Sequence, residues 1–353
     1  MRILGAGTKR DWGNVVPDPG VVLKTGSLDG ITEHNVGDLT ATMRAGVPLA
    51  VAQARFAAEG QMLALDPPLG ADRKATVGGV FATADSGPLR HRYGGPRDLI
   101  IGITVALSDG TVARAGGKVI KNVAGYDLAK LFTGSLGTLG AIVSVNVRLH
   151  PRPQAFATAL GVSVDPAVIA AGARALATAP LELESLDVAW RGGRGWLLAR
   201  TGGAQPEPRA GRAAGLMREQ RLEEAEITRD DEAIWTRQRA GQRSEEATLV
   251  RMATRPSALG DVLSAARDCG AALVGRAALG TSYLELSPDA VAPLRERFCD
   301  APGVVVLDGP VQLRQRHDAW GGRQGPALEL MQRVKRSFDP AGACNPGLFV
   351  GGI

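Results

Sequence analysis

Residues 75–153 read ATVGGVFATADSGPLRHRYGGPRDLIIGITVALSDGTVARAGGKVIKNVAGYDLAKLFTGSLGTLGAIVSVNVRLHPRP. Glycines separate short β-branched runs along the whole of this stretch. Because glycine has no Cβ and adopts positive φ without strain, its backbone N–H groups can approach phosphate or ring atoms closely. We therefore predict that this stretch presses its backbone repeatedly against a large anionic ligand.

A further glycine loop lies near the start of the chain, where a short strand-like run is followed by residues 5–9 (GAGTK). A G-x-G after a strand suggests a Rossmann dinucleotide site. That fingerprint requires a third glycine where this chain has Arg10, and the residues that follow do not look like a helix start. We predict instead an anion nest of successive N–H groups at Gly5, Gly7 and Thr8, with a plain structural turn as the alternative.

The composition predicts two domains with ordinary cores. The chain has 353 residues, 44% of them hydrophobic, and a formal net charge of +5. Arginines alternate with acidic residues and form no dense basic tract, which argues against a nucleic-acid partner. Cys269, Cys299 and Cys344 form no C-x-x-C pair, so we expect no metal site and no iron–sulfur cluster held by this chain alone. Lone thiols suit a cytoplasmic protein, and no apolar run is long enough to span a bilayer.

The first domain is predicted at residues 1–150. Apolar spacing predicts a helix over 48–60, and alternation on either side of Asp109–Gly110 predicts a β-hairpin. A β-branched strand over 138–149 is ended by Pro151 and Pro153, which mark the boundary.

The second domain is predicted at 151–335, followed by a tail at 336–353 that returns to the first domain. Its pattern gives two β-α-β-β-α passes, which predict a ferredoxin-like antiparallel sheet covered by helices and an α+β class overall. Within it, the Arg- and Glu-rich residues 209–226 are predicted as one helix.

Several motifs occur together in a known order. The chain resembles the FAD-binding domain of the vanillyl-alcohol-oxidase/PCMH superfamily, and within it the E subunits of glycolate oxidase. The residues that carry the resemblance are TVGG at 76–79, SGP at 86–88, RYG at 92–94, KNVAGYD at 121–127, GSLGTLG at 134–140, and FDPAG at 338–342 with NPG at 345–347.

The resemblance implies a two-subdomain PCMH-type fold that binds FAD. The first loop would wrap the pyrophosphate, the 76–79 motif would form a second phosphate and flavin-facing loop, and residues 137–142 would contact the adenosine end. The predicted FAD ligands are Gly5, Ala6, Gly7, Thr8, Lys9, Pro67, Thr76, Gly78, Gly79, Ser86, Gly87, Lys121, Tyr126, Gly137, Thr138, Gly140 and Ile142. On this placement, a Gly78→Val side chain would occupy the pyrophosphate position, abolish FAD binding and leave the fold largely intact. The first loop contains no histidine, so we expect FAD to be non-covalent.

Other positions have two interpretations each. Lys118, Lys121 or Arg92 would sit near the flavin pyrimidine edge, where a cation stabilises the reduced flavin, or would simply lie on the surface. Tyr126 would pack on the ligand or fill the core. Asp127 is equally suited to cap the short helix that follows it.

The resemblance further implies oxidation of a 2-hydroxy acid such as glycolate, with hydride transfer to the flavin. Electrons would leave through partners, namely a catalytic flavoprotein subunit and an iron–sulfur subunit, which could also associate the chain with a membrane. The Gly-Asp-Gly-Asn-x-His motif of related dehydrogenases is missing. His91 is the only histidine that we consider as a base, and a non-catalytic His91 is the alternative. The alternatives are a stand-alone FAD-dependent dehydrogenase and an assembly subunit without flavin. The segment before the first glycine loop is short for the family. Either the start site is misassigned, or the domain is trimmed and exposes an edge of its first sheet.

Overall fold

The structure is a computed structural model that describes residues 1–119, 125–244, 246–300, 303–322 and 325–353. Contacts divide the chain into two compact units. Unit 1 comprises Met1–Gly87, Tyr93–Arg152 and Gly322–Ile353, and unit 2 comprises Pro88–Arg92 and Pro153–Gly321. Relative to the proposed domains 1–150 and 151–335 with the tail 336–353, these units place 88–92 in unit 2 and 322–335 in unit 1.

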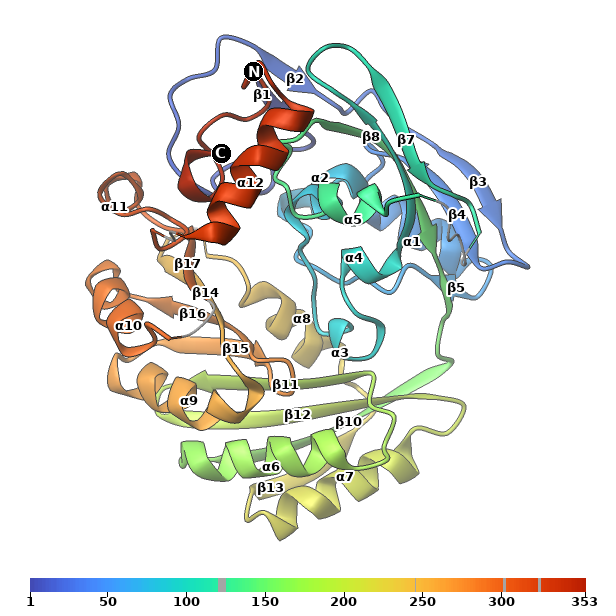
Figure 1. Ribbon diagram of the computed structural model, residues 1–353. Helices are drawn as coiled ribbons and strands as arrows, with labels where there is room; N and C mark the ends of the chain where they lie inside the picture. Colours follow the sequence, from blue (N-terminus) through green and yellow to red (C-terminus); the bar gives the residue numbers. More distant parts are fainter. Residues whose placement is uncertain (120–124, 245, 301–302, 323–324) are drawn as a thin grey trace. The chain divides into compact units, whose positions relative to one another are not determined.

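A five-stranded antiparallel sheet forms the frame of unit 1. Its order is β3-β4-β8-β6-β7, and helices pack on one face of it (Figure 1). Large side chains from the covering helices, Phe56, Phe81 and Phe132, are fully buried under them. The strands are β3 (Ile31–Asn35), β4 (Thr40–Arg44), β6 (Ile100–Ala106), β7 (Val112–Gly116) and β8 (Ala141–Arg148), and the helices are α1 (Leu49–Ala57), α2 (Val77–Thr83), α4 (Pro96–Leu99) and α5 (Leu128–Phe132).

Two short strand pairs complete unit 1. β1 (Arg2–Leu4) pairs in parallel with β2 (Val22–Lys24), and β5 (Gln61–Met62) pairs with β9 (His150–Pro151). The last helix of the chain, α12 (Pro326–Phe338), also belongs to unit 1. The final residues after it hydrogen-bond to the start of the chain, with Asn345 N–H donating to the carbonyl of Met1 at 3.0 Å.

Unit 2 is built from one eight-stranded antiparallel sheet of order β13-β10-β12-β11-β15-β16-β14-β17. The first half runs β10-α6-β11-β12-α7-β13 and the second β14-α9-β15-β16-α10-β17, so each half is one ferredoxin-like pass. The halves join edge to edge where β11 pairs with β15.

The elements of unit 2 are the following. Its strands are β10 (Ala155–Ser163), β11 (Ser185–Arg191), β12 (Arg194–Gly203), β13 (Glu223–Thr228), β14 (Thr248–Ala253), β15 (Ala272–Arg276), β16 (Thr281–Leu286) and β17 (Gly303–Asp308). Its helices are α6 (Pro166–Thr178), α7 (Glu207–Glu219), α8 (Glu232–Ala240), α9 (Leu259–Asp268), α10 (Val291–Arg297) and α11 (Val311–Arg316), while the short α3 (Arg90–Tyr93) begins in unit 2 and ends in unit 1.

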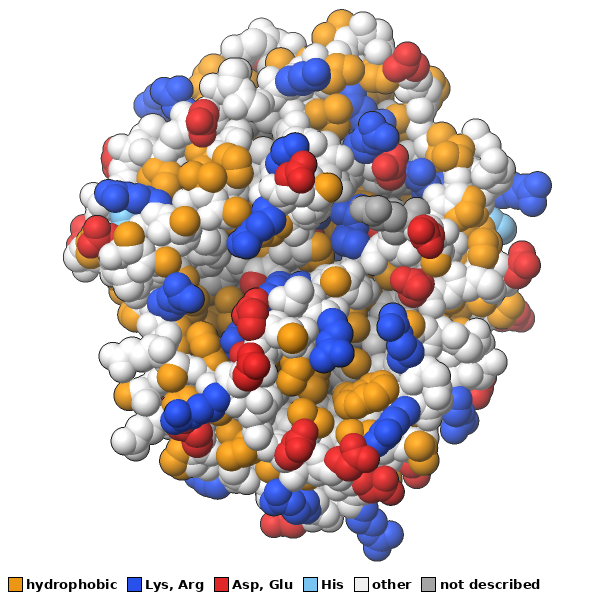
Figure 2. Space-filling view, turned by 180° about the vertical axis from the view of Figure 1, so that it is seen from behind, with side chains coloured by type: hydrophobic (Ala, Val, Ile, Leu, Met, Phe, Trp, Pro, Cys, Tyr) orange, Lys and Arg blue, Asp and Glu red, His pale blue; other side chains and the backbone are white. Residues whose placement is uncertain are grey.

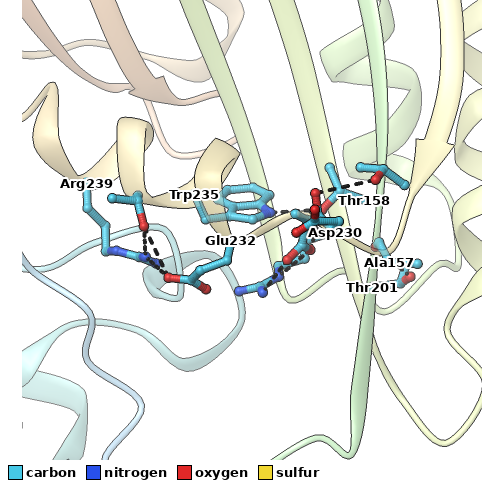
Figure 3. A network of polar contacts seen from close by, with 11 residues as sticks. Ala157, Thr158, Thr201, Asp230, Glu232, Trp235 and Arg239 are labelled. Atoms are coloured by element: carbon cyan, nitrogen blue, oxygen red, sulfur yellow. Dashed lines mark hydrogen bonds and ion pairs between the residues drawn. The ribbon is translucent and has the colours of Figure 1, made fainter.

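Helix α8 lies on the face of the unit 2 sheet opposite α6 and α7 (Figure 1). A buried network holds it there, in which the indole N–H of Trp235 donates to the hydroxyl of Thr158 at 2.8 Å (Figure 3). That hydroxyl donates to Asp231 at 2.8 Å, and the same carboxylate accepts two bonds from Arg200, at 2.9 and 2.7 Å. Because the network joins β10 and β12 to α8, it ties the helix to this face of the sheet.

The predicted α+β class and antiparallel second sheet are confirmed. The predicted helix 48–60 appears as α1, and the predicted hairpin appears as β6 and β7. The prediction of one helix over 209–226 is wrong beyond residue 219, because Arg221 and Glu224 adopt positive φ and the chain continues as β13 along β10. The local charge pattern does not reveal β13, because the strand that it pairs with, β10, lies much earlier in the chain.

Candidate functional site

A cavity of about 80 Å³ lies in unit 1 beside the first glycine loop. We call it the loop cavity. Its walls come from the start of the chain, from α2, from the loop before β8 and from the C-terminal segment. The lining residues are Arg2, Ile3, Leu4, Gly5, Ala6, Gly7, Thr8, Lys9, Arg10, Trp12, Thr76, Gly79, Val80, Ala82, Thr83, Leu136, Asn345 and Leu348.

The glycines of the first loop have distinct roles. A Cβ at Gly5 would lie 2.2 Å from Oγ1 of Thr76, so only glycine lets the loop approach the start of α2 this closely. Gly7 has a φ of +73°, and a Cβ there would meet nothing within 4 Å. The loop therefore packs against protein at Gly5 and presents bare backbone to open space at Gly7.

The charge around the loop cavity suits an anion. Arg2, Lys9 and Arg10 are among its lining residues, and no acidic side chain is among the described ones. Lys9 is paired with Asp85 at 3.1 Å, and the two side chains are only 6% and 2% exposed. Asp85 therefore balances the Lys9 charge within the wall, and the exposed Arg10 is paired with Asp11 at 3.6 Å.

The size of the loop cavity indicates which part of a ligand it takes. Pockets that enclose a drug-sized ligand measure several hundred Å³, so a cavity of about 80 Å³ accommodates only one segment of a dinucleotide. Glycine backbone and basic side chains fit the pyrophosphate of FAD. Of the predicted FAD ligands, seven line this cavity, namely Gly5, Ala6, Gly7, Thr8, Lys9, Thr76 and Gly79.

The 76–79 motif is not a loop in the structure, which corrects that expectation. Thr76 caps α2 by accepting a hydrogen bond from Gly79 N–H at 3.3 Å, and the two glycines form the first turn of the helix. A Cβ at Gly78 would lie 2.7 Å from Cβ of Ala45 and 3.0 Å from its carbonyl oxygen. Gly78 therefore serves helix packing, and the expectation that Gly78→Val leaves the fold intact is wrong.

The predicted ligands at 137–142 lie behind the loop cavity and do not line it. Gly137, with φ +72°, leaves room for the side chain of Asn345. The carbonyl of Thr138 accepts from Lys335 at 2.7 Å. Gly140 packs closely on the carbonyl of Ala106, and Ile142 is buried in β8. Only Leu136, immediately before them, reaches the cavity wall.

Pro67, Ser86 and Gly87 are likewise outside the cavity lining. Pro67 and Ser86 are buried, and a Cβ at Gly87 would lie 2.0 Å from the carbonyl oxygen of Asp66. Glycine at 87 therefore allows the two segments, 66–68 and 86–88, to touch. These residues position α2 and the chain after it.

Two of the three basic residues predicted near the flavin form ion pairs with acidic residues of the chain, and the third lies outside the described residues. Lys118 pairs with Glu33 on the surface of unit 1. Arg92 donates to the carbonyl of Glu182 at 2.8 Å and pairs with Glu184 at 3.5 Å, within unit 2. Lys121 lies outside the described residues.

The structure decides between the two interpretations of Asp127 and excludes one of those of Tyr126. Tyr126 is 91% exposed and so does not fill the core. Asp127 caps α5, where its side chain accepts from the N–H of Lys130.

His91 lies in α3, half-buried. Its Nδ1 is buried without a hydrogen-bond partner. Burial and, second, the neighbouring Arg92 lower the pKa of His91 below its usual 6.5, so the imidazole is neutral at pH 7. A neutral imidazole can accept a proton. Among the described residues, no three His, Cys, Asp or Glu side chains gather in a way that could hold a metal ion.

The tail 336–353 was predicted to return to the FAD domain, but none of its residues was predicted to line the site. Asn345 and Leu348 line the loop cavity together with Arg2, Trp12 and Leu136. The NPG motif at 345–347 was a usable signal, because an ordered motif at the end of a chain must contact something distant in sequence.

The charged surface shows no single sign on the face drawn in Figure 2, where basic side chains alternate with acidic ones. Within the described part of the chain, no helix combines the length and apolarity that crossing a membrane requires.

Two family models match the chain. The FAD binding domain model matches residues 1–116, and the model of the C-terminal domain of FAD linked oxidases matches residues 316–348. These two regions contribute the glycine loop and the C-terminal wall of the same cavity.

Similar curated proteins carry related names. Glycolate oxidase subunit GlcE of Escherichia coli is 38% identical over 139 residues, which is 39% of this chain and 39% of that protein. Glycolate oxidase subunit GlcD of Bacillus subtilis is 38% identical over 159 residues, covering 45% of this chain and 33% of the relative. The matched region thus spans between a third and two fifths of these relatives. An uncharacterized FAD-linked oxidoreductase of Mycobacterium tuberculosis is 25% identical over 94% of this chain and 81% of its own length.

A solved structure shares the fold. Alkyldihydroxyacetonephosphate synthase superposes with a TM-score of 0.67 over 92% of this chain and 67% of its own, at 13% identity. The two family models match the beginning and the end of the chain in the order that the motifs predict. The chain therefore matches an FAD binding domain at its beginning and the C-terminal domain of FAD linked oxidases near its end, and FAD is its cofactor.

Proposed function

We propose that this chain is the FAD-binding subunit of a glycolate oxidase-like enzyme that oxidises a small 2-hydroxy acid. The observation that carries the proposal is the loop cavity, in which bare glycine backbone and basic side chains suit the FAD pyrophosphate. The names of the relatives, glycolate oxidase subunits, support the substrate class.

The chain's own residues have separate tasks in this proposal. The backbone of residues 5–9 holds the pyrophosphate non-covalently, and Arg2 lies in the same cavity wall. Bound FAD supplies the hydride acceptor. Oxidation of a hydroxyl also requires a base, and His91 is our candidate because its imidazole is neutral at pH 7 and its Nδ1 has no partner.

Electrons then leave the chain through partner proteins. We propose a catalytic flavoprotein subunit and an iron–sulfur subunit as these partners. Two of the similar proteins are named as subunits, which supports an assembly. In this proposal the chain is cytoplasmic and reaches a membrane only through its partners.

Spectroscopy of the purified chain tests the cofactor first. We expect visible flavin absorption, and an FAD concentration a hundredfold above Kd should add about 2.7 kcal/mol to the free energy of unfolding. Colourless protein whose melting temperature does not respond to FAD would overturn the proposal and favour an assembly subunit without flavin.

Anaerobic mixing with glycolate or D-lactate tests the reaction. We expect the hydroxy acid to bleach the flavin when it is mixed with the complete complex of subunits, and not when it is mixed with this chain alone. Rapid turnover of an artificial acceptor by the chain alone would favour the stand-alone dehydrogenase. Failure of every hydroxy acid to bleach the flavin of the complete complex would contradict the substrate class.

A further inference from the structure

Asn345 stands at the junction of the two segments that form one wall of the loop cavity. It is 4% exposed, has a φ of +43° and lines the cavity itself. Asparagine tolerates positive φ better than most residues. An asparagine in this conformation, at the end of a chain yet inside a cofactor cavity, requires an explanation beyond turn formation.

Both ends of the Asn345 amide are used. Its Oδ1 accepts from the backbone N–H of Ile3 at 2.7 Å, and its Nδ2 donates to the carbonyl of Leu136 at 2.6 Å. Ile3 lies in β1, which runs directly into the glycine loop. One side chain therefore fixes the spacing between the strand that delivers the glycine loop and the segment that lies before β8.

The chain leaves room for this amide. A Cβ at Gly137 would lie 2.8 Å from Nδ2 of Asn345, so glycine at 137 permits the approach. An amide is the side chain that offers a donor and an acceptor in one plane. An aspartate at 345 would keep the acceptor for Ile3 and lose the donor for Leu136.

The segment that carries Asn345 is itself held firmly. The carboxylate of Asp339 accepts from the N–H groups of Ala343 and Cys344, at 3.0 and 2.7 Å. Lys335 donates to the carbonyls of Thr138 and Cys344, at 2.7 and 2.8 Å. The segment 339–345 is thus tied to the same loop, 134–140, that Asn345 contacts.

We propose that Asn345 is a positioning residue for the FAD loop, so that cofactor binding and docking of the C-terminal segment stabilise one another. The inference rests on the proposed function only through the cofactor. If docking of the segment favours FAD, then FAD must favour docking by the same factor, because coupling between sites is reciprocal. FAD should therefore slow amide hydrogen exchange in residues 343–349.

The test compares two substitutions of Asn345 with a matched control. Asn14 also ties the start of the chain to the C-terminal segment, since its Nδ2 donates to the carbonyl of Phe349 at 3.3 Å, but it does not line the loop cavity. We expect the neutral Asn345→Gln, whose longer side chain misplaces the amide, to raise the Kd for FAD about tenfold through lost positioning alone. Asn345→Asp should raise it further, because it also adds a carboxylate to the wall that faces the pyrophosphate. Asn14→Asp should change that Kd less than about twofold.

Two further outcomes decide the proposal. Equal losses in Asn345→Asp and Asn14→Asp would overturn it, since the C-terminal segment would then act only through general stability. If Asn345→Asp does not fold, amide hydrogen exchange of the wild type tests the proposal instead. Identical exchange rates at residues 343–349 with and without FAD would overturn the coupling. Absence of FAD binding by the wild type would remove the proposed function as well, whereas failure of the coupling alone leaves wild-type affinity intact.

Discussion

The ammonium of Lys335 lies 2.6 Å from the carboxylate of Asp339, one helical turn further along the chain. Both side chains are buried, the carboxylate completely. Burial by itself raises the pKa of Asp339, but hydrogen bonds from Lys335, from Ser108 and from the N–H groups of Cys344 and Ala343 outweigh it and lower the pKa to about 2.

Replacing this carboxylate tests its importance for the C-terminal segment. Asp339→Asn leaves Lys335 buried without a counter-charge, and we expect a loss of about 3–5 kcal/mol in the free energy of unfolding at pH 7. Because the folded pKa lies below the ordinary value of 3.8, the wild-type carboxylate stabilises the fold above about pH 4 and ceases to do so as the pH falls toward 2. Denaturation curves of the two proteins should therefore converge between pH 4 and pH 2. A constant gap over that range would contradict the ion pair.

Removing the partner of Lys9 should have opposite effects on the stability of the protein without FAD and on the stabilisation that FAD adds. Asp85→Asn removes the counter-charge of Lys9, which lines the loop cavity, and should lower the free energy of unfolding without FAD. The same change frees the ammonium to attract the pyrophosphate, so FAD should raise the melting temperature of this variant more than that of the wild type. Thermal melts with and without FAD measure both effects. An FAD-induced shift no larger than in the wild type would show that Lys9 does not face the ligand.

Glycines in the two motifs should respond differently to alanine. Gly78→Ala forces a methyl group against Ala45 and should destabilise the protein by about 1–3 kcal/mol even without FAD. Gly7→Ala meets open space and costs about 1 kcal/mol for its positive φ, but its methyl group would project where ligand is expected. We predict that Gly7→Ala loses more FAD affinity, and Gly78→Ala more stability. Titration with FAD and urea denaturation would refute this if the order were reversed.

His91 provides a kinetic prediction for the enzyme complex. If it accepts the hydroxyl proton, His91→Gln should reduce kcat about 10²- to 10⁴-fold. The pKa of His91 is lowered from 6.5, so kcat/KM of the wild type should decrease with falling pH only at pH values below 6.5. This decrease should be absent in His91→Gln. An unchanged decrease in His91→Gln would assign the base to another residue or subunit.

The parts of the site that sequence alone predicted are those with a local cause. Gly5 and Gly7 follow a strand within a few residues, and positive φ is a property of glycine itself. Gly78 was misplaced because its reason, the approach of Ala45, lies in tertiary packing. The bond from Asn345 to Leu136 spans 209 positions, and no local pattern encodes such a contact. The fold was more accessible, because hydrophobic alternation is repeated along every strand.

Unit 2 offers a prediction about the fold alone, from two ion pairs made by neighbouring residues at the start of α8, of which Figure 3 labels the pair of Glu232 and Arg239. Asp231 receives two bonds from Arg200 and one from Thr158, and its side chain is 4% exposed. Glu232, the next residue, pairs with Arg239 at 2.6 Å but is 71% exposed. Water screens an exposed pair, whereas a buried cation that loses its partner has no replacement.

We therefore expect Asp231→Asn to lower the free energy of unfolding by about 3–5 kcal/mol, and Glu232→Gln by less than about 1 kcal/mol. Neither residue lines the loop cavity, so the Kd for FAD of the folded variants should stay within about twofold of the wild type. Urea denaturation and FAD titration measure the two quantities. Equal stability losses in both variants would show that burial does not decide the strength of these pairs, and a large loss of FAD affinity in Asp231→Asn would show that the network in unit 2 supports the cofactor site as well as α8.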